Sequence, residues 1–462
     1  MKAALINPAA RGAKYNVEPL GLGYIAGYLE QNGIEVRIID EVAGDHISRQ
    51  INAYKPDIAG ITCRPDFVGI SSITPFVKDA YRIADMCRKQ GILTVMGGPH
   101  PSAMPQEALE HADVVVVGEG EKAMLDIVKD GITSGIVSRP YVENIDELPL
   151  PARHLMKQEF YSCTVSRLKQ STLAFLGPDL ASVKTGAVLT SRGCPFRCIF
   201  CPNSLRQSPV RFHSAARVLD ELKQLSINYG VKALTFLDDN FLSDKPRAEE
   251  ICRKMVDEKL NILWSCVTSA HFINRQTAAM IREAGCRQVN FGFESGSQRV
   301  LDILKKPATV EQNKEAIRTC KAMGILVAGS FMIGSPTETV EDVRLTQKFI
   351  LENEPDEFYV NITTPYPGTK LWESCNQKLS RPINWGDFYQ GSLNVYPFSP
   401  FSKAELGRLF VETILAKPTV SSRDWRLALR YPRESTGWLL RHPLTAVKII
   451  LGKYVMQRAT RI

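Results

Sequence analysis

Three cysteines lie close together at Cys194, Cys198 and Cys201, directly after the apolar run 186–190. The spacing C-x3-C-x2-C is typical of thiolates that hold an iron–sulfur cluster. A [4Fe–4S] cluster needs four ligands, so this loop leaves one iron without a protein ligand. An open coordination position is where a metal binds and activates an exchangeable molecule. The motif therefore predicts redox chemistry rather than a structural crosslink.

Structural zinc and a disulfide framework both fit these cysteines less well. Structural zinc usually takes four Cys or His ligands in paired form, but no second pair is present and His213 is the only nearby imidazole. A disulfide framework is disfavoured because the chain has eleven cysteines, an odd number, and the other eight are scattered. Scattered thiols are typical of reduced, buried cysteines, so we expect a cytoplasmic protein.

Size and composition indicate an ordered protein of two or three domains. The chain has 462 residues, of which 44% are hydrophobic and 23% charged, and this length exceeds one ordinary core. The start at 1–8 has too short an apolar run for a signal peptide, and no run of about 18 apolar residues predicts a transmembrane helix.

Residues 1–142 alternate between strand and helix patterns. We expect strands at 3–6, 36–40, 58–62, 93–96 and, as the last of the sheet, 114–117, with helices at 20–31, 76–90 and 122–129. Such alternation predicts a doubly wound parallel sheet with a ligand site at the carboxyl ends of its strands. The loops 7–8, 97–101 and 118–121 fall there, and their glycines allow close backbone approach. The G-x-G-x-x-G dinucleotide fingerprint is absent.

Residues 181–400 repeat the strand–helix rhythm after a linker predicted at 143–180, where Pro and Gly break regular structure. Strands are expected at 234–240, 288–295, 326–334 and 357–362. Barrel chemistry takes place at the carboxyl ends of strands. Polar residues collect at these ends: Asp238, Asp239, Asn240, Glu294, Ser295, Ser330 and Asn361.

The carboxyl-terminal region 401–462 is expected to be helical and basic. Residues 417–462 hold ten Lys and Arg against two acids, which equals the net charge of +8 for the whole chain. Such a tail favours an anionic partner, either a membrane surface or nucleic acid. An amphipathic helix at 443–456 is predicted either to face lipid or to pack on the barrel with a solvated basic side.

The cysteine motif, placed after the first strand of an α/β barrel, resembles that of the radical S-adenosylmethionine (SAM) superfamily. The strings at 19–26, 97–100 and 118–121 resemble the cobalamin-binding domain that precedes the barrel in many of its members. The resemblance implies a Rossmann-like cobalamin-binding domain at 1–142, a partial (β/α)6 barrel at 181–400 and a helical basic region at 401–462. The cobalamin-domain pattern D-x-H-x-x-G is absent, so no histidine is assigned as lower cobalt ligand.

The resemblance also implies site residues. Cys194, Cys198 and Cys201 would hold the [4Fe–4S] cluster, and SAM would bind its open iron. Phe200 would pack near the adenine, and the run 238–240 replaces the Gly-Gly-Glu motif that orients the amino group of SAM. Glu294 would accept hydrogen bonds from ribose, and each acid is alternatively a solvated strand-end residue. Residues 365–369 match the loop after the sixth strand. The other implied contacts are Ser330 and Gly334 for the adenosyl group, and Gly97, Gly98, His100, Gly118, Glu119 and Gly120 for cobalamin.

For His100 the alternatives are a contact with the nucleotide tail of cobalamin and a loop histidine without a ligand. No side chain is assigned to acid–base catalysis, because the cofactors of this family carry the hard steps.

The implied function is methylation of an unactivated carbon in a small-molecule or lipid-like substrate, with SAM, the cluster and cobalamin as cofactors. The alternative is radical cyclisation or rearrangement, as in the anaerobic cyclase of chlorophyll synthesis. A transfer RNA methylthiotransferase is disfavoured because that family carries three cysteines in its amino-terminal domain to hold a second cluster. Here only Cys63 and Cys87 lie in that region. A non-catalytic cobalamin-binding sensor is disfavoured because it has no need of an open cluster. Implied partners are an electron donor such as flavodoxin or ferredoxin and, through the basic tail, a membrane surface; nucleic acid is not expected.

Overall fold

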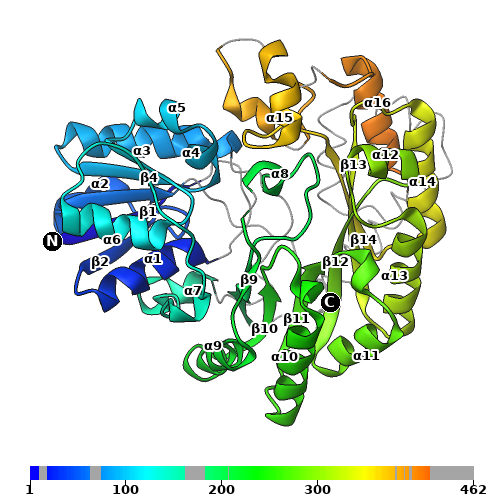
Figure 1. Ribbon diagram of the computed structural model, residues 1–462, viewed down its shortest axis with the longest axis horizontal. Helices are drawn as coiled ribbons and strands as arrows, with labels where there is room; N and C mark the ends of the chain where they lie inside the picture. The colour runs from blue at the N-terminus through cyan, green and yellow to red at the C-terminus, as the bar shows by residue number, and fades with distance from the viewer. Residues whose placement is uncertain are drawn as a thin grey trace, which may run out of the picture.

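The computed structural model describes residues 1–9, 18–62, 74–161, 183–206, 208–379, 382–389, 391–394 and 398–416. The chain forms two α/β bodies, and each is built around a parallel sheet (Figure 1). The predicted α/β class is confirmed. Residues 417–462, with the amphipathic helix predicted at 443–456, lie outside the described residues.

The first body contains a parallel sheet in the order β2–β1–β3–β4–β5–β6. Its bounds are β1 (Lys2–Asn7), β2 (Glu35–Asp40), β3 (Ile58–Thr62), β4 (Leu93–Gly97), β5 (Val114–Val117) and β6 (Gly135–Ser138). The prediction that 114–117 is the last strand was wrong, because β6 pairs beyond it. Only Val137 of β6 is buried, so this edge strand lacks the apolar run that identifies a central strand.

Helices cover both faces of this sheet. One face carries α1 (Leu20–Gln31) and α6 (Gly120–Asp130). The other carries α2 (Ile47–Tyr54), α3 (Val77–Lys89) and α5 (Pro105–Leu109). The helix predicted at 20–31 is confirmed residue for residue, whereas α2 was not predicted. The expected loop 97–101 is also wrong, because α4 (Pro99–Ala103) begins there with proline in its first turn.

The second body has parallel strands in chain order, β7–β10–β11–β12–β13–β14, as in a half-barrel. The bounds are β7 (Lys184–Val188), β10 (Val231–Phe236), β11 (Leu263–Thr268), β12 (Cys286–Glu294), β13 (Leu326–Ile333) and β14 (Glu357–Ile362). Strand β11 was not predicted. Apolar side chains on the outer face pack under the helices α9 (Ala215–Asn228), α10 (Lys245–Asp257), α11 (Arg275–Glu283), α13 (Val310–Ala322), α14 (Val340–Asn353) and α16 (Lys403–Ile414).

Shorter elements surround the cysteine loop. A two-stranded ribbon of β8 (Ser191–Arg192) and β9 (Arg211–Phe212) closes the loop at its base, and α8 (Asn203–Arg206) follows the last cysteine. Helix α12 (Gln298–Ile303) follows β12, and α15 (Lys370–Cys375) begins beside the loop. Among the helices that the structure describes, none combines the length and apolar character needed to cross a bilayer.

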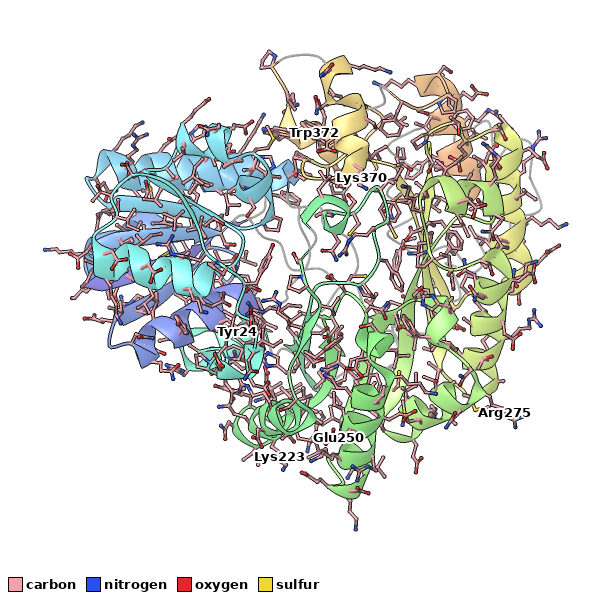
Figure 2. The ribbon with its side chains drawn as sticks, viewed as in Figure 1. Tyr24, Lys223, Glu250, Arg275, Lys370 and Trp372 are labelled. Carbon is pink, nitrogen blue, oxygen red and sulfur yellow. The ribbon has the colours of Figure 1, made fainter. Side chains whose placement is uncertain are left out.

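The predicted linker 143–180 is described as far as α7 (Gln158–Tyr161), and this part packs along the junction of the two bodies. Arg153, with 1% of its side chain exposed, pairs with Glu18 of the first body and with Glu221 of α9 at 2.6 Å. It also donates to the Ala187 carbonyl of β7 at 2.8 Å. Figure 2 places Tyr24 of α1 at the same junction, where its hydroxyl lies 3.4 Å from the Leu189 carbonyl.

Candidate active site between the two parallel sheets

A cavity of about 630 Å³ lies between the carboxyl ends of the two sheets. The carboxyl end of β3 and the loops that follow β4 and β5 line one side, at the point where a doubly wound sheet binds ligands. The cysteine loop, the segment that follows β10 and residues of β11 to β14 line the other side. Predicted residues on its wall are Gly97, Gly98, Gly118, Glu119, Gly120, Cys194, Cys198, Phe200, Cys201, Asp238, Asp239, Asn240, Glu294 and Ser330.

The cysteine loop is held by hydrogen bonds from distant segments. The Ile199 N–H donates to the Leu304 carbonyl at 3.1 Å, and the Leu371 N–H of α15 donates to the Ile199 carbonyl at 3.0 Å. The three cysteines form no disulfide. Burial raises the pKa of Cys194 to about 11 and that of Cys201 to about 12. A metal that binds these thiols must therefore displace their protons.

The run 238–240 combines a support for the loop with a side chain on the cavity wall. Asp238 is buried and accepts hydrogen bonds from the Thr190 N–H at 3.1 Å, from the Thr190 hydroxyl at 2.9 Å and from the Ser191 hydroxyl. It thereby ties the end of β10 to the start of the cysteine loop. Asn240 accepts from the Thr268 hydroxyl at 2.8 Å, whereas Asp239 is exposed. Their predicted role toward the amino group of SAM stays a prediction.

Glu294 forms a buried ion pair that was not predicted. Its carboxylate lies 2.9 Å from the Lys306 ammonium, and the two side chains are 8% and 13% exposed. Burial alone would lower the pKa of Lys306, but the charge of Glu294 outweighs it and raises that pKa. The pair packs over Gly292, where an added Cβ would lie 2.3 Å from the Glu294 carboxylate. Glu294 itself has φ of 63°, a conformation that is rare outside glycine and concentrated at functional sites.

Replacing Lys306 with methionine is expected to destabilise the protein by about 3–5 kcal/mol, because it leaves the Glu294 carboxylate buried without its partner. Thermal and urea unfolding of the apoprotein measure this change. The matched control is Lys305→Met, since the neighbouring Lys305 is exposed and its loss should change stability by less than about 0.5 kcal/mol. Equal effects of the two variants would contradict the importance of the ion pair.

The wall on the side of the first body is a glycine-rich cradle. Gly118 has φ of 97°, and a Cβ added there would meet no atom within 4 Å, so its backbone borders open space. A Cβ on Gly120 would lie 2.6 Å from Ile25. Because glycine has no Cβ, the start of α6 can pack close to α1. Apolar side chains complete this wall: Leu5, Leu22, Ile25, Ile61, Val95, Val116 and Met124.

Two predicted residues lie elsewhere. Gly334 turns at the end of β13 with φ of 81°, and its N–H donates to Glu338 at 2.6 Å. His100 is on α4 rather than on a loop and is fully buried, with its ring nitrogens 3.2 Å from the Thr74 hydroxyl and 3.6 Å from Glu107. Their predicted contacts with the adenosyl group and with cobalamin stay predictions.

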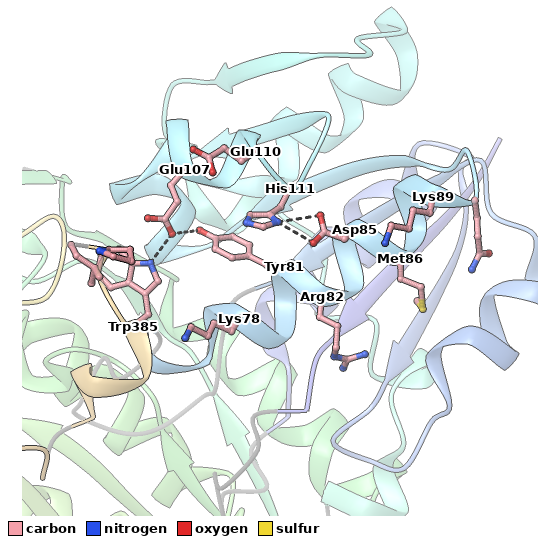
Figure 3. A pocket seen from close by; sticks show the side chains of 13 residues that line it. Lys78, Tyr81, Arg82, Asp85, Met86, Lys89, Glu107, Glu110, His111 and Trp385 are labelled. Carbon is pink, nitrogen blue, oxygen red and sulfur yellow. Dashed lines mark hydrogen bonds and ion pairs between the residues drawn. The ribbon is translucent and has the colours of Figure 1, made fainter. Parts of the chain in front are cut away.

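A second, more open cavity of about 1120 Å³ lies against α3 (Figure 3). Its wall includes Trp385, whose indole N–H donates to Glu107 at 2.7 Å, and Tyr81, whose hydroxyl donates to the same carboxylate at 2.8 Å. His111 lies 3.1 Å from Asp85. These bonds attach the segment around Trp385 to the first body, and none of the predicted site residues lines this cavity.

Comparisons with known proteins agree with this arrangement. Residues 188–350 match the radical SAM superfamily and residues 7–128 match the B12 binding domain. An uncharacterized methyltransferase of Pyrococcus horikoshii is 35% identical over 83% of this chain and 85% of its own length. The anaerobic magnesium-protoporphyrin IX monomethyl ester cyclase of Rubrivivax gelatinosus is 28% identical over 79% and 67%.

The fold also resembles a solved structure. The radical SAM methyltransferase TsrM from Kitasatospora setae, with cobalamin and a [4Fe–4S] cluster bound, superimposes with a TM-score of 0.65 at 20% identity over 88% of this chain and 85% of that one. The chain therefore belongs to the radical SAM superfamily, in the group that carries a B12-binding domain. It is an enzyme whose cofactors are a [4Fe–4S] cluster, SAM and cobalamin.

The residues of this chain fit these groups. Three cysteines of one loop reach the cavity, and their sulfurs are the donor type that iron–sulfur clusters use. On the side of the cavity opposite the cysteine loop, the open space beside Gly118 and the apolar wall around it leave room for a large planar ligand. Asn290 of β12, Ser330 of β13 and Tyr359 of β14 add polar side chains to the wall of the same cavity.

Several residues of the cavity wall were not predicted. Lys306, Arg211, Asn290 and Tyr359 belong to it, and no local pattern in the sequence marks them. Arg192 could have been proposed from the sequence, because it stands two residues before Cys194, the first cysteine of the motif. Its role becomes visible only through its ion pairs with the first body.

Proposed function

We propose that this enzyme methylates an unactivated carbon of a small-molecule or lipid-like substrate in the cavity between the two sheets. The observation that carries the proposal is that one cavity is lined both by the cysteine loop and by the glycine cradle. When bound, the cluster with SAM supplies a carbon-centred radical and cobalamin supplies a methyl group, so the substrate needs access to both. The methyltransferase name of the 35% identical relative supports this proposal.

The chain itself positions the reactants and excludes water. Cys194, Cys198 and Cys201 would hold the cluster, while Asp238 orients the start of their loop through three hydrogen bonds. The apolar wall around Gly118 would cover one face of cobalamin and keep water out. A dry, preorganised site suits radical intermediates, which react with whatever lies nearby.

Radical ring closure is the second candidate, because a cyclase is also among the relatives, at 28% identity over 79% of this chain. For either reaction we propose a one-electron donor such as flavodoxin or ferredoxin. We also propose that the basic tail 417–462 contacts a membrane surface; it lies outside the described residues.

The products of SAM distinguish the two candidates. The protein is reconstituted without oxygen with iron, sulfide and hydroxocobalamin, then given SAM and titanium(III) citrate. We expect release of both S-adenosylhomocysteine and 5′-deoxyadenosine, because methylation consumes one SAM as methyl donor and another as radical source. Release of 5′-deoxyadenosine alone would contradict methyl transfer and favour ring closure. Loss of cobalamin on gel filtration would also contradict methyl transfer.

A further inference from the structure

The ribbon at the base of the cysteine loop carries two arginines that face each other. Strand β8 pairs antiparallel with β9, and Arg192 stands directly opposite Arg211. The loop that the ribbon closes contains all three cysteines. The two side chains are only 13% and 8% exposed. Like charges directly opposite each other destabilise a strand pair, so this ribbon needs an acid between them.

Glu119 of the first body supplies that acid. Its carboxylate accepts from Arg192 at 3.0 Å and, with both oxygens, from Arg211 at 2.8 and 2.9 Å. A two-point carboxylate–guanidinium pair of this kind is strong and geometrically specific. Burial alone would raise the pKa of Glu119, but the hydrogen bonds from Arg211 and the charge of Arg192 outweigh it and lower that pKa. The carboxylate is therefore ionised between two cations.

Further contacts hold the same arginines to the first body. Glu121 accepts from the second terminal nitrogen of Arg192 at 2.6 Å. The ring of Tyr24 lies 5.2 Å from the Arg192 guanidinium, within cation–π range. Arg211 donates to the Val142 carbonyl at 2.7 Å. The first body thus supplies the partners of both arginines, although the ribbon belongs to the second body.

Glu119 also belongs to the glycine cradle. It follows Gly118 and stands at the N-cap of α6, but its side chain makes no capping hydrogen bond. The backbone of this stretch borders the cavity, while the carboxylate reaches across to the ribbon. One residue therefore joins the wall expected to hold cobalamin to the base of the loop expected to hold the cluster.

We propose that Glu119 is a positioning residue that sets the spacing between the two cofactors by clamping the base of the cysteine loop to the glycine cradle. The inference rests on the proposed function, since the spacing matters when both cofactors serve one substrate. Without this carboxylate, two buried arginines repel each other across the ribbon, and the loop loses its fixed position relative to the first body.

The spacing can be measured directly by pulsed electron paramagnetic resonance. The holoenzyme is reduced so that cobalt(II) and the cluster both carry unpaired electrons. In the wild type we expect one narrow cobalt–cluster distance. Glu119→Gln keeps the side-chain size and removes the charge, so we expect a broadened distribution, together with loss of the match between the amounts of S-adenosylhomocysteine and 5′-deoxyadenosine. Glu119→Asp keeps the charge and should restore part of the narrow distance.

The matched control is Glu41→Gln, because Glu41 pairs with Arg82 at 3.2 Å within the first body. An unchanged distribution in Glu119→Gln, or equal broadening in Glu41→Gln, would overturn the proposal. If Glu119→Gln does not fold, Arg211→Lys replaces it, since lysine keeps the charge but loses the two-point contact with Glu119. An unchanged cobalt–cluster distance in Arg211→Lys would also overturn the proposal. Failure of the wild type to retain cobalamin would instead contradict the proposed function.

Discussion

Replacing Cys198 with alanine is expected to abolish reductive cleavage of SAM. The other two thiolates cannot hold a cubane on their own, and Cys198 is the most buried of the three. Loss of a residue that only supports a metal ligand costs about 10–100-fold, so loss of a ligand should cost more than about 100-fold. Iron and sulfide content, together with the rate of 5′-deoxyadenosine formation under titanium(III) citrate, measure the effect.

The control for this experiment is Cys375→Ala. Cys375 is also buried, but it lies on α15, and its thiol donates to the Leu371 carbonyl at 3.1 Å. It does not line the cavity, so its loss should leave the iron content unchanged. Full iron content in Cys198→Ala, or loss of iron in Cys375→Ala, would show that the ligands are assigned wrongly.

Arg153→Met should be the most destabilising substitution at the junction of the two bodies. The guanidinium is buried between Glu18 and Glu221, so its removal leaves two carboxylates without a partner. Breaking a buried ion pair in this way costs about 3–5 kcal/mol, because the remaining charge is uncompensated. Urea unfolding of the apoprotein measures the loss, and limited proteolysis should show earlier cleavage between the two bodies.

Arg139→Met provides the comparison. Arg139 also forms an ion pair, with Asp126 at 2.6 Å, but both side chains are about a third exposed. Exposed pairs contribute about 0–1 kcal/mol. If Arg153→Met cost no more than Arg139→Met, the buried triad would not hold the two bodies together.

Much of the fold was predictable because its signals are local. The helix 20–31 and the strand 58–62 have the predicted bounds, since an apolar period or run marks them within a few residues. The wrong predictions of secondary structure have local causes too. β6 is a half-exposed edge strand, and the four-residue pattern it offers is too short to identify. The predicted loop 97–101 contains His100 after a strand and two glycines, whereas Pro99 begins α4.

The candidate site was predictable in part. Fourteen of the sixteen predicted site residues reach one cavity, because parallel strands bring their carboxyl ends, and the loops after them, to a common edge. The partners of these residues were not predictable. Glu294 binds Lys306 from a turn after α12, and Asp238 supports the start of the cysteine loop rather than standing free in solvent. Sequence position alone does not reveal such pairs.

The sequence by itself determined the chemistry available to this protein: three thiolates at cluster spacing, glycines at strand ends and two runs of alternating strands and helices. These features depend on residues close in the chain. Only the tertiary structure decided how the two halves meet. The bond from Arg192 to Glu119 spans 73 positions and that from Arg211 to Glu119 spans 92. Such pairs form because a buried charge needs a partner, and packing decides which opposite charges come within reach of it.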